Sequence, residues 1–168
     1  VYSSILPETF DDRMKIRMVN PMEIFAAKGN ALITRAAARD LYDWCNMLSE
    51  GLFEEQRDLF RKCFLFYMTI SADTLNKSFD TSAIDTLDFN KIRRDLFPVL
   101  NKKDNFQLDE RKKIAKNYIL NLMVLTTKEK EYLDRFEEKK YMPELLFEDA
   151  EIVERVKNHP MALWKCKD

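Results

Sequence analysis

The sequence predicts a mainly α-helical fold, a helical bundle that follows a short N-terminal β-strand or hairpin. Three observations favour this fold class. The 168 residues include only two glycines and five prolines, so residues that make tight turns are scarce. Good helix formers such as Leu, Lys, Glu and Met are abundant. Apolar residues also recur at three- and four-residue spacing along most of the chain after residue 21.

The length of the chain is sufficient for one hydrophobic core, so we expect a single domain. Within it we expect a strand-containing N-terminal segment at 1–20 and a helical C-terminal domain at 21–168. Residues 14–19 alternate apolar and basic side chains, as a strand does. Asn20 then offers an N-terminal cap and Pro21 suits the first position of a helix, so the first helix is predicted to start there.

The remaining helices are predicted from apolar spacing and from the residues at their ends. Gly51 is placed to stop the second helix, Asp88 to cap a short one, and Thr126 with Glu129 has the spacing of a capping box. Residues 78–88 have the composition of a polar linker. We expect helices from 22 onward, from about 39 to 50, and over 52–77, 89–97, 109–125, 127–140 and 150–158.

Composition and charge exclude several functional classes. The chain has 28 Lys and Arg against 29 Asp and Glu, a net charge of −1, which is not typical of a protein that coats nucleic acid. Two glycines cannot supply a phosphate loop or a dinucleotide fingerprint. Cys45, Cys63 and Cys166 lie far apart, which indicates reduced thiols in a cytoplasmic protein. The longest apolar run, 63–70, is far shorter than the roughly 20 residues of a membrane span.

Few residues suggest metal or nucleophilic chemistry. The single histidine, His159, precedes a proline, and we expect it to cap the C-terminus of a helix. No cluster of histidines and cysteines is present, so no metal site is expected. No serine or cysteine nucleophile has a recognisable base nearby in the sequence.

The segment 22–48 carries the best candidates for a functional site. Lys28 lies among apolar residues and is followed by Arg35 and Arg39. On one continuous helix these cations would lie within roughly 40° of one another, in a stripe about 16 Å long that suits phosphate groups. Asp40 and Asp43 share a helix face and could orient Arg39 or Lys28, or hold a metal-bound ligand. In the alternative interpretation, the carboxylates only satisfy the helix dipole and the arginines face solvent.

A family resemblance bears on this choice. Residues 22–35 read MEIFAAKGNALITR and residues 39–43 read RDLYD. They resemble the downstream motifs of the AbiEii/AbiGii family, nucleotidyltransferase-like toxins of abortive-infection toxin–antitoxin systems. That pattern has a glutamate, Ala-Lys, Ala-Leu, an arginine, and Arg-Asp-x-x-Asp with a tyrosine inside, and each position is filled here. Residues 141–147 and 159–165 are similar to the C-terminal end of these proteins, so the resemblance runs from about 14 to 166.

The resemblance implies roles for the candidate residues. Lys28 would contact nucleotide phosphates, while Asp40 and Asp43 would support catalysis or align the lysine. Arg35 and Arg39 would add phosphate contacts. For the full-length protein it implies an NTP, Mg²⁺, a cognate antitoxin and an RNA acceptor such as tRNA. The expected N-terminal strand would be a remnant of the nucleotidyltransferase sheet.

The sequence departs from the family in one large respect. Family members have an upstream Gly-Ser pair and an Asp-x-Asp metal site, and neither occurs in this sequence. Paired carboxylates holding Mg²⁺ are what allow an acceptor oxygen to attack an NTP. We therefore expect this chain to be the C-terminal helical part of such a toxin, holding neither Mg²⁺ nor NTP by itself and inactive alone.

An interpretation from another class is a non-catalytic helical module for protein interaction, similar to an antitoxin. In that case the residues from Lys28 to Asp43 form a surface network. Exposed apolar residues, for which Trp164 and Phe147 are the candidates, would then form the partner interface.

A further interpretation is a helical bundle that binds nucleic acid through a basic patch in the middle of the chain. Nearby aspartates offset this patch, which favours a solvated face instead. The basic residues are Lys91, Arg93, Arg94, Lys102 and Lys103, and the aspartates are Asp88, Asp95 and Asp104.

Overall fold

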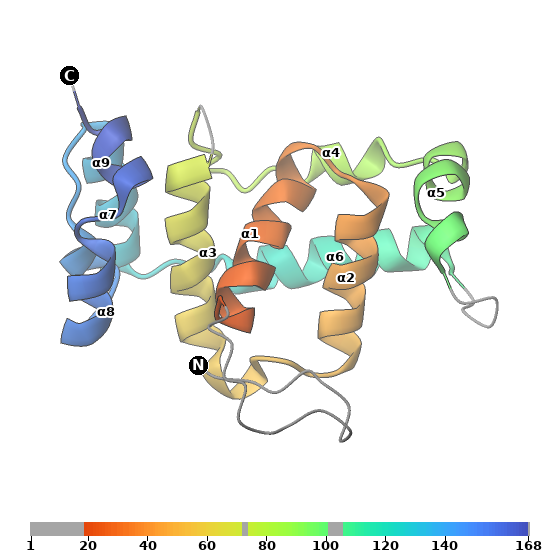
Figure 1. Ribbon diagram of the computed structural model, residues 1–168, viewed down its shortest axis with the longest axis horizontal. Coiled ribbons are helices and arrows are strands. Elements are labelled where there is room, and N and C mark those ends of the chain that lie inside the picture. Colours follow the sequence, from red (N-terminus) through yellow and green to blue (C-terminus); the bar gives the residue numbers. More distant parts are fainter. Residues whose placement is uncertain (1–18, 72–73, 101–105, 168) are drawn as a thin grey trace, which may run out of the picture.

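The computed structural model describes residues 19–71, 74–100 and 106–167, and within these ranges it contains nine α-helices and no strand (Figure 1). The prediction of a mainly α-helical chain is confirmed. The strand expected at 14–19 lies, except for its last residue, outside the described residues. The division into a segment 1–20 and a helical domain 21–168 stays a prediction.

The helices form a central group with smaller elements at both ends. In Figure 1, α1, α2, α3 and α6 lie in the middle, α5 lies at one end, and α7, α8 and α9 lie together at the other. The α-helices are α1 (Pro21–Thr34), α2 (Ala38–Ser49), α3 (Arg57–Ser71), α4 (Ser82–Asp85), α5 (Phe89–Asp95), α6 (Leu108–Leu122), α7 (Thr127–Glu137), α8 (Ala150–Val156) and α9 (Pro160–Lys165). Three single 3₁₀ turns join them: η1 (Glu54–Gln56), η2 (Phe97–Val99) and η3 (Pro143–Leu145).

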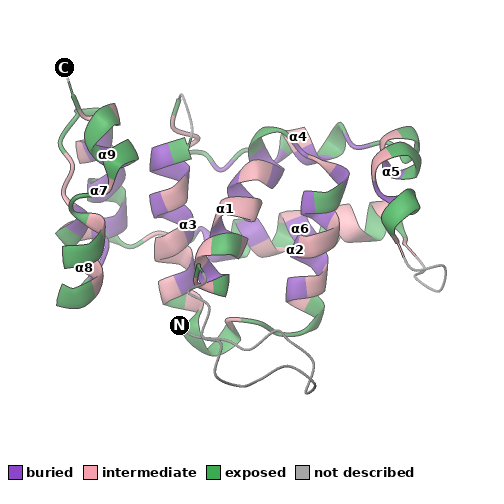
Figure 2. Ribbon diagram, in the orientation of Figure 1, coloured by how far each residue is buried: buried purple, intermediate pink, exposed green. Residues whose placement is uncertain are grey.

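The core is centred on an aromatic cluster between α1, α2, α3 and α6. Trp44 on α2 is fully buried, with its ring centroid 5.8 Å from that of Phe60, 6.0 Å from Phe64 and 6.1 Å from Tyr118. Gly29 lets α1 approach this cluster, because a Cβ at that position would lie 2.4 Å from the Trp44 ring. Figure 2 shows the buried residues on the facing sides of these helices and mostly exposed residues on α5 and α8.

The start of α1 follows its sequence signals, but its end does not. The Asn20 side chain accepts a hydrogen bond of 2.9 Å from the Met22 N–H, as predicted. The helix then stops at Thr34, and Ala36 takes a left-handed φ of 48°. α2 starts afresh at Ala38. The second helix expected from about 39 is therefore confirmed, and the continuous basic stripe of about 16 Å considered for one helix does not form, because Lys28 lies on α1, Arg35 follows its end and Arg39 lies on α2.

The C-terminal helices are joined to α3 through polar groups that are themselves buried. Thr126 and Glu129 form the predicted capping box at the start of α7. The Glu129 carboxylate, 1% exposed, also accepts a hydrogen bond of 3.0 Å from Arg61 Nε on α3. One α7 side chain, Tyr132, lies 3.0 Å from the hydroxyl of Thr69. These contacts fix where the last third of the chain lies.

Other predicted boundaries require correction. The helix expected at 52–77 consists of η1 and the shorter α3, because Gly51 and Phe53 both take positive φ. The linker expected at 78–88 contains α4, and the segment after residue 158 contains α9. His159 is the N-cap residue of α9 rather than a C-terminal cap, and its side chain makes no capping hydrogen bond. Trp164 is exposed as expected, whereas Phe147 is buried.

Candidate functional site

All five predicted site residues line one open hollow on the surface. It lies between the end of α1, the start of α2 and the end of α5, and its volume is about 580 Å³. Its lining consists of Lys28, Arg35, Ala37, Ala38, Arg39, Asp40, Asp43, Arg94 and Asp95. The break between the two helices does not separate the candidates, because α2 folds back against α1.

Lys28 and Asp43 form an ion pair across the hollow. Lys28 Nζ on α1 donates a hydrogen bond of 2.5 Å to Asp43 Oδ2 on α2. The two side chains are 32% and 37% exposed, so both charged groups can still be reached from solvent. The carboxylate therefore holds the ammonium group at a fixed place in the hollow while leaving part of its surface open.

Arg35 and Asp40 form a second pair beside the first. Both Nε and Nη2 of the guanidinium contact the same oxygen, Asp40 Oδ2, at 3.3 and 3.2 Å. The Asp40 side chain is only 7% exposed, whereas that of Arg35 is 69% exposed. Asp40 also lies in the first turn of α2, where the helix dipole favours a carboxylate. The dipole interpretation thus applies to Asp40, in addition to its role in positioning Arg35.

The third cation connects the hollow to α5. Arg39 Nε donates a hydrogen bond of 3.0 Å to the backbone carbonyl of Asp95. Arg94 in turn pairs with the Asp95 carboxylate through Nε at 2.6 Å and Nη2 at 2.7 Å. Arg94 was predicted only as part of a basic patch, not of this site. Arg94 lies far from Lys28 in the sequence, so no local sequence pattern indicates that α5 packs against α2.

The glutamate of the sequence pattern lies outside this hollow. Glu23, in the first turn of α1, accepts a hydrogen bond of 3.0 Å from the Tyr67 hydroxyl and pairs with Arg155 at 3.5 Å. It therefore connects α1 to α3 and α8. Burial, reinforced by the charge of Glu23, raises the pKa of Tyr67 above its usual value, so the hydroxyl keeps its proton.

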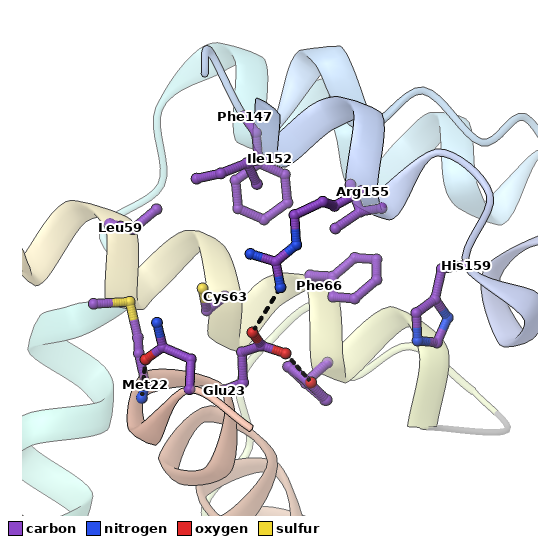
Figure 3. Close-up of a pocket in the computed structure, with 12 residues that line it drawn as sticks. Met22, Glu23, Leu59, Cys63, Phe66, Phe147, Ile152, Arg155 and His159 are labelled. Carbon is purple, nitrogen blue, oxygen red and sulfur yellow. Dashed lines mark hydrogen bonds and ion pairs between the residues drawn. The ribbon is translucent and has the colours of Figure 1, made fainter. Parts of the chain in front are cut away.

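Glu23 and Arg155 also line a smaller cavity of about 180 Å³ (Figure 3). In Figure 3 the two side chains point toward each other between helices from opposite ends of the chain. The walls are largely apolar, with Leu59, Phe66 and Ile152 among them. Burial raises the pKa of the neighbouring Cys63 thiol to about 12, so this thiol is a poor nucleophile. These contacts favour a structural role for the cavity.

The described residues do not form a metal site. No group of three or more histidine, cysteine or acidic side chains is placed to hold a metal ion among them. In the hollow, the carboxylates of Asp40 and Asp43 each face a cation of the protein instead. Carboxylates that are paired with cations in this way are not arranged as a Mg²⁺ site.

Two further expectations can be compared with the structure. Cys45, Cys63 and Cys166 are all free thiols, as expected. Among the described residues, no helix has the length and apolar character that crossing a membrane requires.

Comparison with known proteins gives one match. The family model described as "Nucleotidyl transferase AbiEii toxin, Type IV TA system" matches residues 2–117, which is 116 of the 168 residues. The matched range contains both helices of the hollow, α5, and all the candidate site residues. Searches of curated proteins and of solved structures find no match.

Proposed function

Because the chain belongs to the AbiEii family of nucleotidyl transferase toxins, which act in type IV toxin–antitoxin systems, we propose that its hollow forms one wall of an NTP cleft. One observation carries the proposal. The cations of the motif half 22–35 meet the arginine and both aspartates of the half 39–43 at one hollow, although the chain breaks between α1 and α2. Family membership also implies an NTP substrate and a cognate antitoxin, and it weighs against an antitoxin-like module.

The cations are suited to bind the triphosphate. In nucleotidyl transfer an acceptor oxygen attacks the α-phosphorus, the nucleoside monophosphate moves to the acceptor, and pyrophosphate leaves. Negative charge grows on the leaving group, so positive groups fixed beforehand in the cleft stabilise the transition state. Lys28 supplies a point charge, and the exposed guanidinium of Arg35 supplies a fork of donors that matches phosphate oxygens.

The carboxylates act as positioning residues for these cations. Asp43 holds Lys28 and Asp40 holds Arg35, each within hydrogen-bond distance. Fixing long side chains in advance reduces the conformational entropy that they lose when a phosphate binds. This positioning role explains why the motif has both aspartates, and it requires no Mg²⁺ bound to them.

The chain by itself provides only one part of the reaction machinery. The Gly-Ser and Asp-x-Asp motifs of the family are not in this sequence. We therefore expect the chain alone to bind triphosphate only weakly and to transfer no nucleotide. A Kd in the millimolar range corresponds to a binding free energy of about −4 kcal/mol. The acceptor in our proposal is an RNA such as tRNA.

The proposal is tested by titrating the chain with inorganic tripolyphosphate and following backbone amide resonances by NMR. We expect the largest shifts around Lys28, Arg35 and Arg39. Lys28→Ala should weaken binding by about tenfold, the effect of losing one charge-assisted hydrogen bond of about 1.5 kcal/mol.

Lys116→Ala is the matched control. Lys116 pairs with Asp85 at 2.6 Å and its side chain is 29% exposed, so the pair resembles Lys28–Asp43 but lies outside the hollow. Equal losses in the two variants would show that only general positive charge matters and would reject the proposed site. In the same samples, transfer of a labelled nucleotide to RNA by the chain alone would contradict its expected inactivity.

A further inference from the structure

The hollow has a second wall, at the end of α5, that lies outside both halves of the sequence motif. Arg94 lines the hollow from this wall, whereas Lys28 lines it from α1. α2 packs against both α1 and α5 and lies between them in Figure 1, so the two outer helices border different sides of the hollow. The Arg94 side chain is 74% exposed, so its guanidinium can be reached by a ligand.

Arg94 is held in one orientation by the residue that follows it. Its Nε donates a hydrogen bond of 2.6 Å to Asp95 Oδ1, and its Nη2 donates one of 2.7 Å to Oδ2. The hydrogen bond from Arg94 lowers the pKa of the Asp95 carboxyl, so this group stays charged. A guanidinium has five N–H donors in a planar fork. Asp95 engages two of them, and the others remain for a ligand.

The end of α5 is itself fixed in place. A helix of seven residues is too short to be stable alone, so its position depends on contacts with the rest of the fold. The side chain of Ile92 is fully buried in the core. The backbone carbonyl of Asp95 also accepts the 3.0 Å hydrogen bond from Arg39 Nε on α2. These contacts keep the Arg94–Asp95 pair at the hollow.

The charges of the hollow favour an anionic ligand. Four cations and three carboxylates line it, and Arg39 is the cation that makes no ion pair with a described residue. The hollow therefore has an excess of one positive charge. An ion pair between exposed side chains adds little to stability. The stability of the fold thus does not explain why Arg94 and Asp95 meet at this site, whereas binding of an anion does.

We propose that Arg94 binds phosphate oxygens of the ligand in the hollow and that Asp95 is its positioning residue. This rests on the proposed function, which makes a triphosphate that ligand. The guanidinium fork matches two phosphate oxygens, and fixing it beforehand reduces the entropy that binding costs. A triphosphate that contacts Lys28 and Arg94 together bridges two walls, whereas a single phosphate contacts one wall at a time.

NMR titrations of the chain with inorganic tripolyphosphate and with orthophosphate, at low salt, test this assignment. Arg94→Ala should weaken tripolyphosphate binding by about tenfold, the effect of losing one charge-assisted contact. Orthophosphate binding should weaken by no more than about twofold, because the other wall remains available to a ligand that uses only one. Arg94→Lys keeps the charge but not the fork of donors, so it should restore only part of the lost tripolyphosphate affinity.

Arg93→Ala is the matched control. Arg93 is also exposed and also lies in the last turn of α5, where the helix dipole favours a cation, but it does not line the hollow. The variant therefore removes the same charge from the same helix end. It should change the Kd for tripolyphosphate by less than about twofold. Circular dichroism and the urea midpoint verify that every variant is folded.

Three results would overturn the role of Arg94. They are unchanged tripolyphosphate binding by Arg94→Ala, an equal loss in Arg93→Ala, and full recovery of affinity in Arg94→Lys. Lys28→Ala distinguishes this failure from failure of the proposed function. If Lys28→Ala loses affinity and Arg94→Ala does not, the hollow still binds phosphate and only the role of Arg94 is rejected. If neither variant loses affinity, the proposed function is rejected as well.

Discussion

Gly29→Ala provides a direct test of how α1 packs. An added Cβ would lie 2.4 Å from Trp44 Cζ3, 2.5 Å from Phe64 Cε2 and 2.6 Å from Trp44 Cη2, whereas ordinary contacts begin at 3.4 Å. Each ring would have to move by about 1 Å. Trp44 and Phe64 are both fully buried and in contact with other rings, so neither has free space to enter.

Two opposing effects set the size of the loss in stability. Overpacking a dense core costs up to about 3 kcal/mol. Replacing glycine by alanine inside a helix stabilises the helix by about 1 kcal/mol. We therefore expect Gly29→Ala to lower the free energy of unfolding by about 2 kcal/mol. With an m-value of about 2 kcal/mol/M, the urea midpoint should fall by about 1 M.

Urea unfolding followed by tryptophan fluorescence measures this shift. Gly51→Ala is the control, because Gly51 has a positive φ of 62° but no atom within 4 Å of an added Cβ. It introduces backbone strain without a clash and should cost about 1 kcal/mol. A midpoint for Gly29→Ala equal to or above that of the unaltered chain would refute the close packing of α1 on Trp44.

Two further predictions concern buried charge and buried thiols. Glu129→Ala should lower the free energy of unfolding by about 3 kcal/mol, since it removes the capping box and the buried partner of Arg61, whereas the exposed Lys130→Ala should change the urea midpoint little. Burial raises the pKa of the Cys45 thiol to about 11 and that of Cys63 to about 12, so above about pH 9 the folded state keeps protons that the unfolded state loses. Stability should therefore fall by about 1.4 kcal/mol per thiol for each pH unit between about 9 and 11, and urea midpoints that are equal at pH 8 and 10 would contradict this.

The parts of the fold predicted correctly are those set by neighbouring residues. Asn20, Asp88 and the Thr126–Glu129 box all cap helices as expected, because each cap joins groups within three residues of one another. The break after α1 had no such signal. Ala36 takes a positive φ that alanine disfavours, and it is 3% exposed, so tertiary packing imposes that conformation.

The same distinction applies to the candidate site. Residue types and spacing identified Lys28 and Asp43, and the structure places them within hydrogen-bond distance. The geometry considered for one continuous helix does not apply, because the two residues lie on the separate helices expected from 22 and from about 39. Arg94 joins the hollow only because α5 packs beside α2, through the Arg39 contact to Asp95. Contacts across such separations depend on the whole fold, and helical periodicity does not encode them.

The two ion pairs of the hollow have a consequence for ligand choice. Asp40 and Asp43 are tethered counterions, so each is present near its cation at a high effective concentration. A small anion with one charge would exchange one counterion for another and gain little. A polyanion that spans the hollow would meet Lys28 and Arg35 together and compete with both aspartates at once. The built-in counterions would therefore act as a filter that discriminates ligands by their number of charges.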